Sequence, residues 1–178
     1  MIYYTSDLHF YHANIIQHCK RPFKSVEEMN STLIKNWNRK VSVNDTVYIV
    51  GDMFFYQKSP IEAILSSLNG KKHLIIGNHD KQWIKKFDLS LYFESVDNLK
   101  EIRDDGKKIT LCHYPMMTWN NADRGAFLVY GHIHNNKRDF FWNLLKAMDN
   151  AFNAGVDINN FEPVTFEEMV KNNLEFKK

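Results

Sequence analysis

The chain has 178 residues, of which 44% are hydrophobic and 25% charged, a composition typical of a globular protein and not of a disordered or fibrous one. This length suits one domain, which we expect to span residues 1–178. The 23 lysines and arginines nearly balance the 21 aspartates and glutamates, which argues against a surface that coats polyanions.

No pattern for export or membrane insertion is evident. The first residues reach an acid, Asp7, without a preceding basic segment, unlike a signal peptide. No apolar run approaches the roughly 20 residues that span a bilayer. Cys19 and Cys112 lie far apart and have no CxxC partners, so neither a disulfide framework nor a zinc knuckle is indicated. We therefore expect a cytoplasmic protein with reduced cysteines, no membrane contact and no obligate protein partner.

The first polar pair follows a β-rich run at the start of the chain. Residues 2–6 favour a strand, and Asp7 and His9 come directly after it. Side chains alternate along an extended segment, so we expect these two to face the same side, where they could bind one cation. For this pair alone, a polar strand end with a hydrogen-bonded histidine remains the alternative.

Three amphipathic segments predict helices in the first half of the chain. Residues 13–19 and 59–68 carry apolar side chains at helical spacing. A helix over residues 25–40 is favoured because Ser25 and Glu28 have the spacing of a capping box.

Two further strands also end in polar side chains. Residues 46–50 lead into Asp52, and residues 71–76 lead into residues 77–80, with the sequence Gly-Asn-His-Asp. Open α/β sheets gather their functional groups at the carboxyl ends of the strands. The order of elements therefore predicts an α/β fold in which these groups meet along one edge.

The second half of the chain is richer in strands. His113 ends one of them, and His132 and His134 end another, where alternation again predicts that the pair faces one way. Residues 135–150 mix basic and aromatic side chains, which indicates either a short amphipathic helix covering the sheet, which we favour, or a mobile substrate-side loop. We expect a short helix over 81–87, strands over 91–96, 99–103, 108–112, 126–130 and 151–157, and a capped helix over 165–172.

These strand ends together supply an inventory of metal ligands. Carboxylates, imidazoles and an amide oxygen, with no thiolate, suit Mn, Fe, Zn, Ni or Co rather than a sulfur-rich zinc site. The groups are too many for one ion, so two ions that share a bridging carboxylate fit better. They are Asp7, His9, Asp52, Asn78, His79, His113, His132 and His134.

The same motifs resemble those of the calcineurin-like metallophosphoesterases, and the size is similar to that of small single-domain prokaryotic and phage members. The residues 155–160, Gly-Val-Asp-Ile-Asn-Asn, also look like that subgroup. The resemblance implies an α/β fold, a four-layer α/β/β/α sandwich of two mixed sheets flanked by helices. The matching motifs are Asp-x-His at 7–9, Gly-Asp at 51–52, Gly-Asn-His-Asp at 77–80, His113 and Gly-His-x-His at 131–134.

The resemblance further implies two divalent ions, with Mn as our first choice and Fe, Zn, Ni or Co as alternatives. Asp52 would bridge them. One ion would be held by Asp7, His9, Asp52 and His134, and the other by Asp52, Asn78, His113 and His132.

The implied reaction is hydrolysis of a phosphate ester by attack of a metal-bridging hydroxide. His79, which belongs to neither implied ligand set, would act as the general acid. Asp80 would orient the ring of His79 or raise its basicity. Removing such an acid costs roughly 100- to 10,000-fold in rate.

Two departures from the family pattern bear on the substrate rather than on the metals. Tyr11 stands where the family often has a glycine, and residues 53–55, Met-Phe-Phe, stand where it often has an acid. Tyr11, His12 and Arg21 are therefore candidate contacts to phosphate or base, with an ordinary surface role as the alternative for each.

We expect a phosphodiesterase acting on a nucleotide-like small molecule or an oligonucleotide, because the chain is too short for a large cap over a small monoester. One alternative is a phosphomonoesterase acting on a nucleotide or a phosphoprotein. Another is a catalytically silent nucleic-acid-binding module that stacks bases on Phe54, Phe55, Tyr56 and residues 137–142. The intact His79 argues against silence, because a purely structural metal site has no need of it.

Overall fold

The computed structural model describes residues 1–55 and 60–178, so Tyr56 and the expected helix start at Ser59 lie outside the described residues. Within those ranges, no helix combines the length and apolarity needed to cross a bilayer. Cys19 and Cys112 are both free thiols. The strands are β1 (Ile2–Thr5), β2 (Thr46–Ile49), β3 (Lys71–Ile75), β4 (Ser95–Asp97), β5 (Leu99–Asp104), β6 (Lys107–Cys112), β7 (Phe127–Tyr130) and β8 (Ala151–Asn153).

Helices occupy the connections between these strands and the end of the chain. The α-helices are α1 (Ala13–His18), α2 (Val26–Lys40), α3 (Ile61–Ser67), α4 (Trp142–Ala147) and α5 (Phe166–Phe176). Short 3-10 helices are η1 (Asp80–Gln82), η2 (Ile84–Lys86), η3 (Leu89–Leu91) and η4 (Ala122–Arg124).

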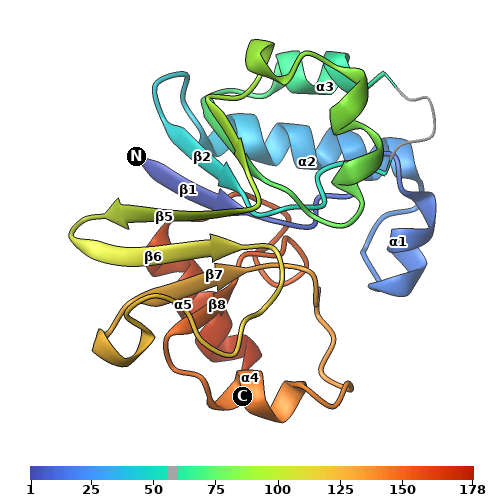
Figure 1. The fold of residues 1–178 in the computed structure, drawn as a ribbon. Coiled ribbons are helices and arrows are strands. Elements are labelled where there is room, and N and C mark those ends of the chain that lie inside the picture. Colours follow the sequence, from blue (N-terminus) through green and yellow to red (C-terminus); the bar gives the residue numbers. More distant parts are fainter. Residues whose placement is uncertain (56–59) are drawn as a thin grey trace.

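Two four-stranded sheets pack face to face. The first has the order β1-β2-β3-β4 with all neighbours parallel, and the second has the order β5-β6-β7-β8, in which only the β5–β6 pair is antiparallel. In Figure 1, α2 and α3 lie above the first sheet, and α4 and α5 lie on the side of the second sheet. This arrangement confirms the expected four-layer sandwich, but only the second sheet is mixed as expected, because every pair in the first sheet is parallel.

Alternate residues of β2 show why the layers stack in this way. Val47 and Ile49 pack with the helices of the first layer, whereas Tyr48 and Val50 pack in the cluster between the two sheets. Both faces of the strand are therefore buried, which explains its continuous apolar sequence. A third cluster, with Trp142 of α4, covers the outer face of the second sheet.

The predicted caps differ in completeness. At α5, Thr165 accepts a hydrogen bond from the backbone of Glu168, whose carboxylate accepts one from the Thr165 backbone, so the capping box is closed. At α2, Ser25 accepts from the Glu28 backbone at 3.2 Å, but the Glu28 carboxylate accepts from Lys24 instead. Only half of that predicted box forms.

Two predicted elements of the middle segment are only partly correct. The helix expected over 81–87 is two short 3-10 turns, and the strand expected over 91–96 is reduced to β4, with η3 before it. The Asp88 side chain accepts hydrogen bonds from the backbone and hydroxyl of Ser90, which favours a turn over a strand at this point. The apolar residues that suggested a strand serve instead to anchor that turn, since Phe93 is buried.

Of the two later segments, one matches the expectation and the other ends earlier. Residues 135–150 contain the favoured short helix, α4, whose Trp142 and Leu145 are buried against the second sheet. The strand expected over 151–157 stops at Asn153. The side chain of Asn153 accepts a hydrogen bond from the backbone N–H of Gly155 at 2.7 Å, and this contact turns the chain.

Candidate metal centre

The polar strand ends of both sheets converge on one side of the molecule. In Figure 1 the arrowheads of β1, β2, β6 and β7 all lie toward the same side. Parallel strands carry their terminal loops to one edge, so residues far apart in sequence become neighbours there. The strand ends supply Asp7 and His9 after β1, Asp52 after β2, Asn78 and His79 after β3, His113 after β6, and His132 and His134 after β7.

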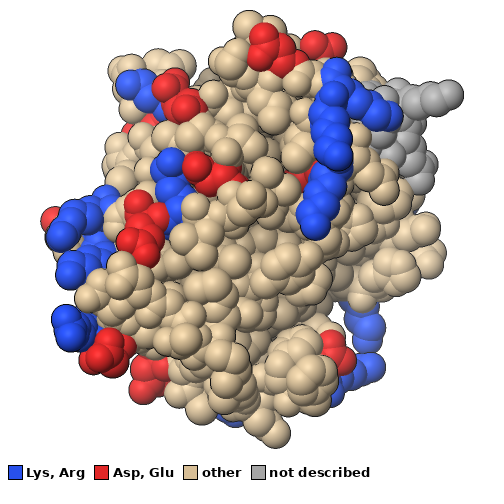
Figure 2. All heavy atoms as spheres, viewed as in Figure 1, with Lys and Arg blue, Asp and Glu red and all other residues tan. Residues whose placement is uncertain are grey.

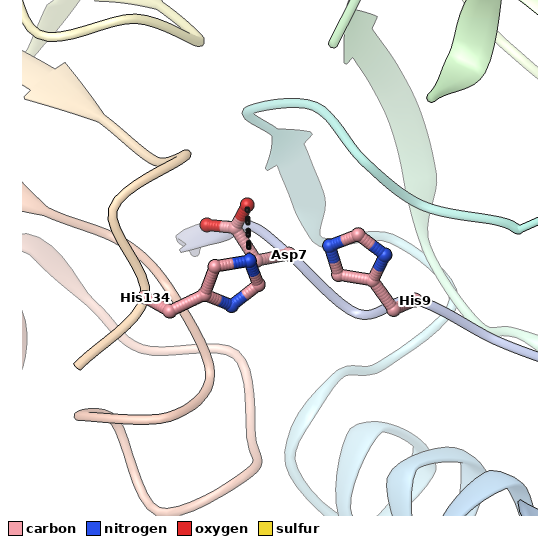
Figure 3. Close-up of side chains that lie close together, drawn as sticks. All are labelled: Asp7, His9 and His134. Atoms are coloured by element: carbon pink, nitrogen blue, oxygen red, sulfur yellow. Dashed lines mark ion pairs between the residues drawn. The ribbon is translucent and has the colours of Figure 1, made fainter. Parts of the chain in front are cut away.

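The first group of ligand atoms belongs to Asp7, His9 and His134. One atom of each lies within 4.8 Å of the other two. Figure 3 shows the three side chains together, with Asp7 and His134 on separate loops and paired at 4.0 Å between Oδ1 and Nε2. The Asp7 carboxylate is held by the backbone N–H of His132, which donates to both of its oxygens at 3.0 Å.

The second group comprises Asp52, His113 and His132, again with one atom of each within 4.8 Å of the others. Nε2 of His113 lies 3.4 Å from Oδ2 of Asp52 and 3.1 Å from Oδ1 of Asn78. The structure thus places His132 and His134 in different groups. The prediction that alternation turns both imidazoles the same way is wrong.

Asp52 stands between the two groups. Its Oδ2 lies 3.6 Å from Nε2 of His9 as well as 3.4 Å from Nε2 of His113, and the residue is only 1% exposed. Burial alone would raise the pKa of Asp52, but the hydrogen bond and charge of His113 hold it below its usual value. Asp52 is therefore a buried carboxylate that lies within 3.6 Å of a histidine from each group.

The buried imidazole of His9 provides a test of whether a metal ion fits here. Its Nε2 has no hydrogen-bond partner among the described residues, although leaving a buried nitrogen unpaired costs about 1–3 kcal/mol. Burial lowers the pKa of His9 well below its usual value, so the ring is neutral and can offer a lone pair. A divalent ion would satisfy this nitrogen.

Protons on two other histidines compensate the buried carboxylates. Burial on its own lowers the pKa of His113, but its contact with Asp52 and the charge of Asp7 raise it to about 9. For His134, Asp7 and Asp157 overcome the same effect and raise the pKa to about 11. Metal ions bind the deprotonated forms of such ligands and take over this charge compensation, so the donor set fits cations.

The ligands lie on an unusual backbone. Most of the candidate ligands adopt positive φ angles, which are uncommon outside glycine but tolerated by Asp, Asn and His. Asp7 and His9 therefore come together through left-handed backbone turns and not through strand alternation, because β1 ends at Thr5 and neither residue lies in an extended strand. The residues are Asp7 (56°), His9 (51°), Asp52 (54°), His132 (71°) and His134 (51°).

Glycine is required where the loops press against these ligands. Gly51 has φ of 88°, and a Cβ added to it would overlap the ring of His113. A Cβ on Gly77 would overlap the carboxylate of Asp52. The glycines in the Gly-Asp and Gly-Asn-His-Asp motifs therefore allow the loops to approach the centre closely.

Asp80 does not contact the ring of His79, contrary to the expectation that it orients that ring. Its buried carboxylate accepts hydrogen bonds from the backbone of Asp52, Met53 and Gly77, and from the indole of Trp83, at 2.8–3.0 Å. Asp80 therefore holds the loop that carries Asp52 against the loop that carries Asn78.

Arg21 is also placed differently from the substrate contact that the sequence suggested. Its side chain is fully buried, and its guanidinium binds the Asp157 carboxylate and donates to the backbone carbonyls of Asp7 and Leu8. The other side of Asp157 contacts Nδ1 of His134 at 2.9 Å. Arg21 and Asp157 thus support the first ligand group from behind. Sequence reasoning missed Asp157, for which the Gly-Val-Asp segment at 155–157 was the available indication.

His12 and Tyr11 lie beside the first ligand group. The His12 ring stacks on Phe55 at 3.9 Å between centroids, and its Nδ1 is 3.2 Å from Nδ1 of His9. Burial and nearby His79 lower the pKa of His12 to about 4, so this neutral ring can accept a hydrogen bond from the Nδ1–H of His9, which leaves Nε2 of His9 with its lone pair free. The hydroxyl of Tyr11 donates to the backbone of Pro60.

Only part of the stacking surface suggested for a silent nucleic-acid module is exposed, because within residues 137–142 Phe140 is 97% exposed whereas Trp142 is buried. Phe54 is fully buried, with its ring packed between Phe10 and Trp83. Phe55 is covered by His12, and Tyr56 lies outside the described residues.

Comparison with known proteins agrees with this centre. The family model described as calcineurin-like phosphoesterase matches residues 1–165. The chain belongs to this family. Membership supports a hydrolase that acts on a phosphate ester with divalent metal ions, and the clustered Asp and His side chains are the candidate ligands.

Relatives of this phosphoesterase occur in archaea and in phages. It is 38% identical over 173 residues to an uncharacterised protein of Methanocaldococcus jannaschii, covering 96% of this chain and 89% of that protein. It is 31% identical over 159 residues to the Gene 66 protein of Mycobacterium phage L5, covering 74% of this chain and 76% of the phage protein. A crystal structure of a protein of unknown function from Aquifex aeolicus matches with a TM-score of 0.73 and 30% identity, over 96% of this chain and 98% of that one.

The buried Asp157 contacts both Arg21 and the candidate ligand His134, so its replacement tests whether it supports that ligand. In Asp157→Asn, the Arg21 guanidinium would remain buried without its counterion, and we expect the free energy of unfolding to fall by about 3–5 kcal/mol. Metal affinity should fall by about 10- to 100-fold, because His134 loses the carboxylate that orients it. Denaturant titration and metal titration measure the two effects.

The matched control is Asp123→Asn, at an exposed position in η4, which should change neither quantity. Equal metal affinities for Asp157→Asn and the wild type would show that Asp157 does not support the ligand group.

Proposed function

We propose that this protein is a dinuclear metal-dependent phosphodiesterase. The observation that carries the proposal is the position of Asp52, whose one carboxylate oxygen faces His9 of the first group and His113 of the second. A bridging carboxylate between two ligand groups is the arrangement that two-metal hydrolases require. In the proposed centre, one ion is held by Asp7, His9, Asp52 and His134, and the other by Asp52, Asn78, His113 and His132.

The ligand chemistry favours Mn as the first choice for both positions, with Fe, Zn, Ni or Co as alternatives, because the donors are oxygens and imidazoles. When bound, the ions supply an activated water and neutralise charge on the phosphoryl oxygens. Asp52 and Asp7 would hold them, and backbone N–H groups already fix both carboxylates in place.

His79 is the proposed proton donor. Its side chain is 36% exposed, and its Nε2 lies 4.0 Å from Oδ2 of Asp52, at the rim of the centre. Its backbone N–H donates to Oδ1 of Asp52 at 2.9 Å, which fixes the residue beside the proposed bridge. From this position Nε2 gives a proton to the leaving-group oxygen as the bond from phosphorus breaks. The same nitrogen is within reach of the His9 and Asp52 ligands, so a role as a metal ligand is the alternative.

Access to the centre supports a diester as the substrate. His132 is exposed and His79 is more than one third exposed, so both ends of the ligand array meet solvent. A chain that continues beyond the scissile phosphate on both sides could therefore cross this edge. The proposed substrates are accordingly a nucleotide-like diester or an oligonucleotide.

The proposal is tested with purified protein loaded with Mn. Metal analysis should find two ions per chain, and bis(p-nitrophenyl) phosphate should be hydrolysed with a higher kcat/KM than p-nitrophenyl phosphate. The chelated protein should lose this activity and regain it when metal returns. A higher kcat/KM for the monoester would refute the diester preference, and a failure to hydrolyse either ester with Mn, Fe, Zn, Ni or Co would refute the function.

A further inference from the structure

A groove of about 540 Å³ opens directly beside the candidate metal centre. His132 and His134 lie in its wall, so a molecule bound at the centre can extend into it. One side is formed by the end of α1 at residues 18–20, and the other by the segment that follows β7, from residue 132 to Phe141. Beyond His134, no residue of this second segment belongs to the proposed metal centre.

Hydrogen bonds fix the two sides of the groove relative to each other. The Asn135 side chain crosses the groove and donates to the backbone carbonyl of Cys19 at 2.9 Å. On the far side, the side-chain Oδ1 of Asn136 accepts from the backbone N–H of Arg138 at 2.9 Å and orders the turn. The side chains that line the groove therefore project from a defined frame.

The charge of the groove is locally positive. Lys20, Lys137 and Arg138 line it against one acid, Asp139, which accepts a hydrogen bond from Asn136 at 2.6 Å. The ammonium of Lys137 lies over the rings of Trp142 and Phe176, whereas the charged ends of Lys20 and Arg138 have no partner within the described ranges.

The face drawn in Figure 2 carries charged side chains of both signs. On the face shown in Figure 2, basic and acidic side chains are interspersed, and tan surface separates them. The whole chain carries a formal charge of only +2. Two unpaired cations beside a phosphoesterase centre are therefore a local feature and not part of a generally basic protein.

An exposed aromatic ring stands next to these cations. Phe140 is 97% exposed, although it lies between two groove residues, Asp139 and Phe141. Among the described residues, its ring contacts one other ring, that of Phe141, at 5.6 Å between centroids and 71° between planes. A fully exposed phenyl ring beside a basic groove offers a stacking face for a base.

We propose that this groove binds a single-stranded polynucleotide, with Lys20 and Arg138 contacting phosphates that flank the scissile one and Phe140 stacking on an unpaired base. Basic grooves with aromatic platforms bind single strands in this way, with little sequence preference. This inference rests on the proposed phosphodiesterase function and names its substrate class.

The first experiment measures binding and hydrolysis separately. Metal-loaded protein is titrated against a fluorescent, phosphorothioate-linked single-stranded oligonucleotide at several salt concentrations. Lys20 has φ of 53°, so asparagine rather than alanine replaces it. The double variant Lys20→Asn with Arg138→Ala should bind more weakly, and its log K against log salt slope should be shallower by about 1.4, at about 0.7 for each lost phosphate contact. Hydrolysis of bis(p-nitrophenyl) phosphate, which has no flanking phosphate, should be unchanged.

The matched control is Lys85→Ala with Arg124→Ala, two exposed cations that do not line the groove. An unchanged slope for the groove variant, or an equal loss for the control, would overturn the inference. The function itself fails by a different result, namely no hydrolysis of bis(p-nitrophenyl) phosphate by the wild type.

A second variant tests the stacking role of Phe140. Phe140→Ala should weaken binding of the single strand by about tenfold, while Leu91→Ala, which also truncates an exposed apolar side chain, should not. The bases of a duplex are already stacked, so binding of a duplex of the same sequence should be insensitive to Phe140. Equal losses for single strand and duplex would contradict stacking on an unpaired base.

Discussion

Replacing Asp52 by asparagine is expected to remove bound metal and hydrolytic activity together. The substitution keeps the shape of the side chain but leaves one neutral oxygen where a carboxylate faces both His9 and His113. Losing a residue that only supports a metal ligand costs about 10- to 100-fold in metal affinity, so losing the proposed bridging ligand should cost more. Metal content per chain and the hydrolysis rate of a model diester are the two measurements.

Asp97→Asn is the matched control for this experiment. Asp97 also ends a strand of the first sheet, but its partly exposed carboxylate pairs with Lys100 and lies outside both ligand groups. It should retain two ions and full activity. If Asp52→Asn also retained both, Asp52 would not be the bridge.

His79→Asn is expected to slow hydrolysis by roughly 100- to 10,000-fold while leaving two ions bound. The reason is that the proposed proton donor is lost while every proposed ligand remains. The loss should be larger for an alkyl diester, whose leaving oxygen needs a proton, than for a nitrophenyl diester, whose leaving group departs as an anion. Rates with both substrates and metal content per chain test this expectation.

His73→Asn serves as the control, since His73 lies on β3, which leads into the same loop, and contacts Ser95 rather than the centre. It should leave the rate unchanged. Loss of an ion from His79→Asn, with equal losses for the two diesters, would instead identify His79 as a metal ligand.

Local sequence patterns predicted most elements because local physics determines them. The run over 46–50 is apolar on both faces since β2 is buried on both, and the Thr165 and Glu168 pair closes a cap that involves only neighbouring residues. The segment around Leu91 misled the same reasoning. Its apolar residues look like a strand, but the Asp88 side chain accepts a hydrogen bond from the backbone of Ser90, and the chain turns there.

Which side chains gather as candidate ligands could also be predicted from sequence, because parallel strands bring their ends to one edge. Side-chain alternation, however, does not explain how the pairs Asp7 and His9, or His132 and His134, are placed. Alternation along a strand cannot place Asp7 and His9, since both have left-handed backbone conformations beyond the end of β1. It also failed to separate His132 from His134, which belong to different ligand groups.

The supporting residues depend on contacts that no local pattern encodes. Arg21 and Asp157 are 136 positions apart, yet they form one buried ion pair behind His134. Asp80 reaches the backbone of Asp52, 28 positions earlier, rather than the ring of its neighbour His79. These partners are decided by how the two sheets pack, which is a property of the whole chain.

The left-handed ligands also determine how this centre can be altered without disturbing its loops. A left-handed conformation costs about 1–2 kcal/mol for most residues, whereas asparagine and aspartate adopt it readily. Alanine at Asp7, Asp52 or His132 would therefore remove a ligand and strain the loop in one step. An alanine scan would confound folding with chemistry, and asparagine is the replacement that separates the two. By the same physics, exchange among aspartate, asparagine and histidine is the path by which such a centre could change its metal while retaining its fold.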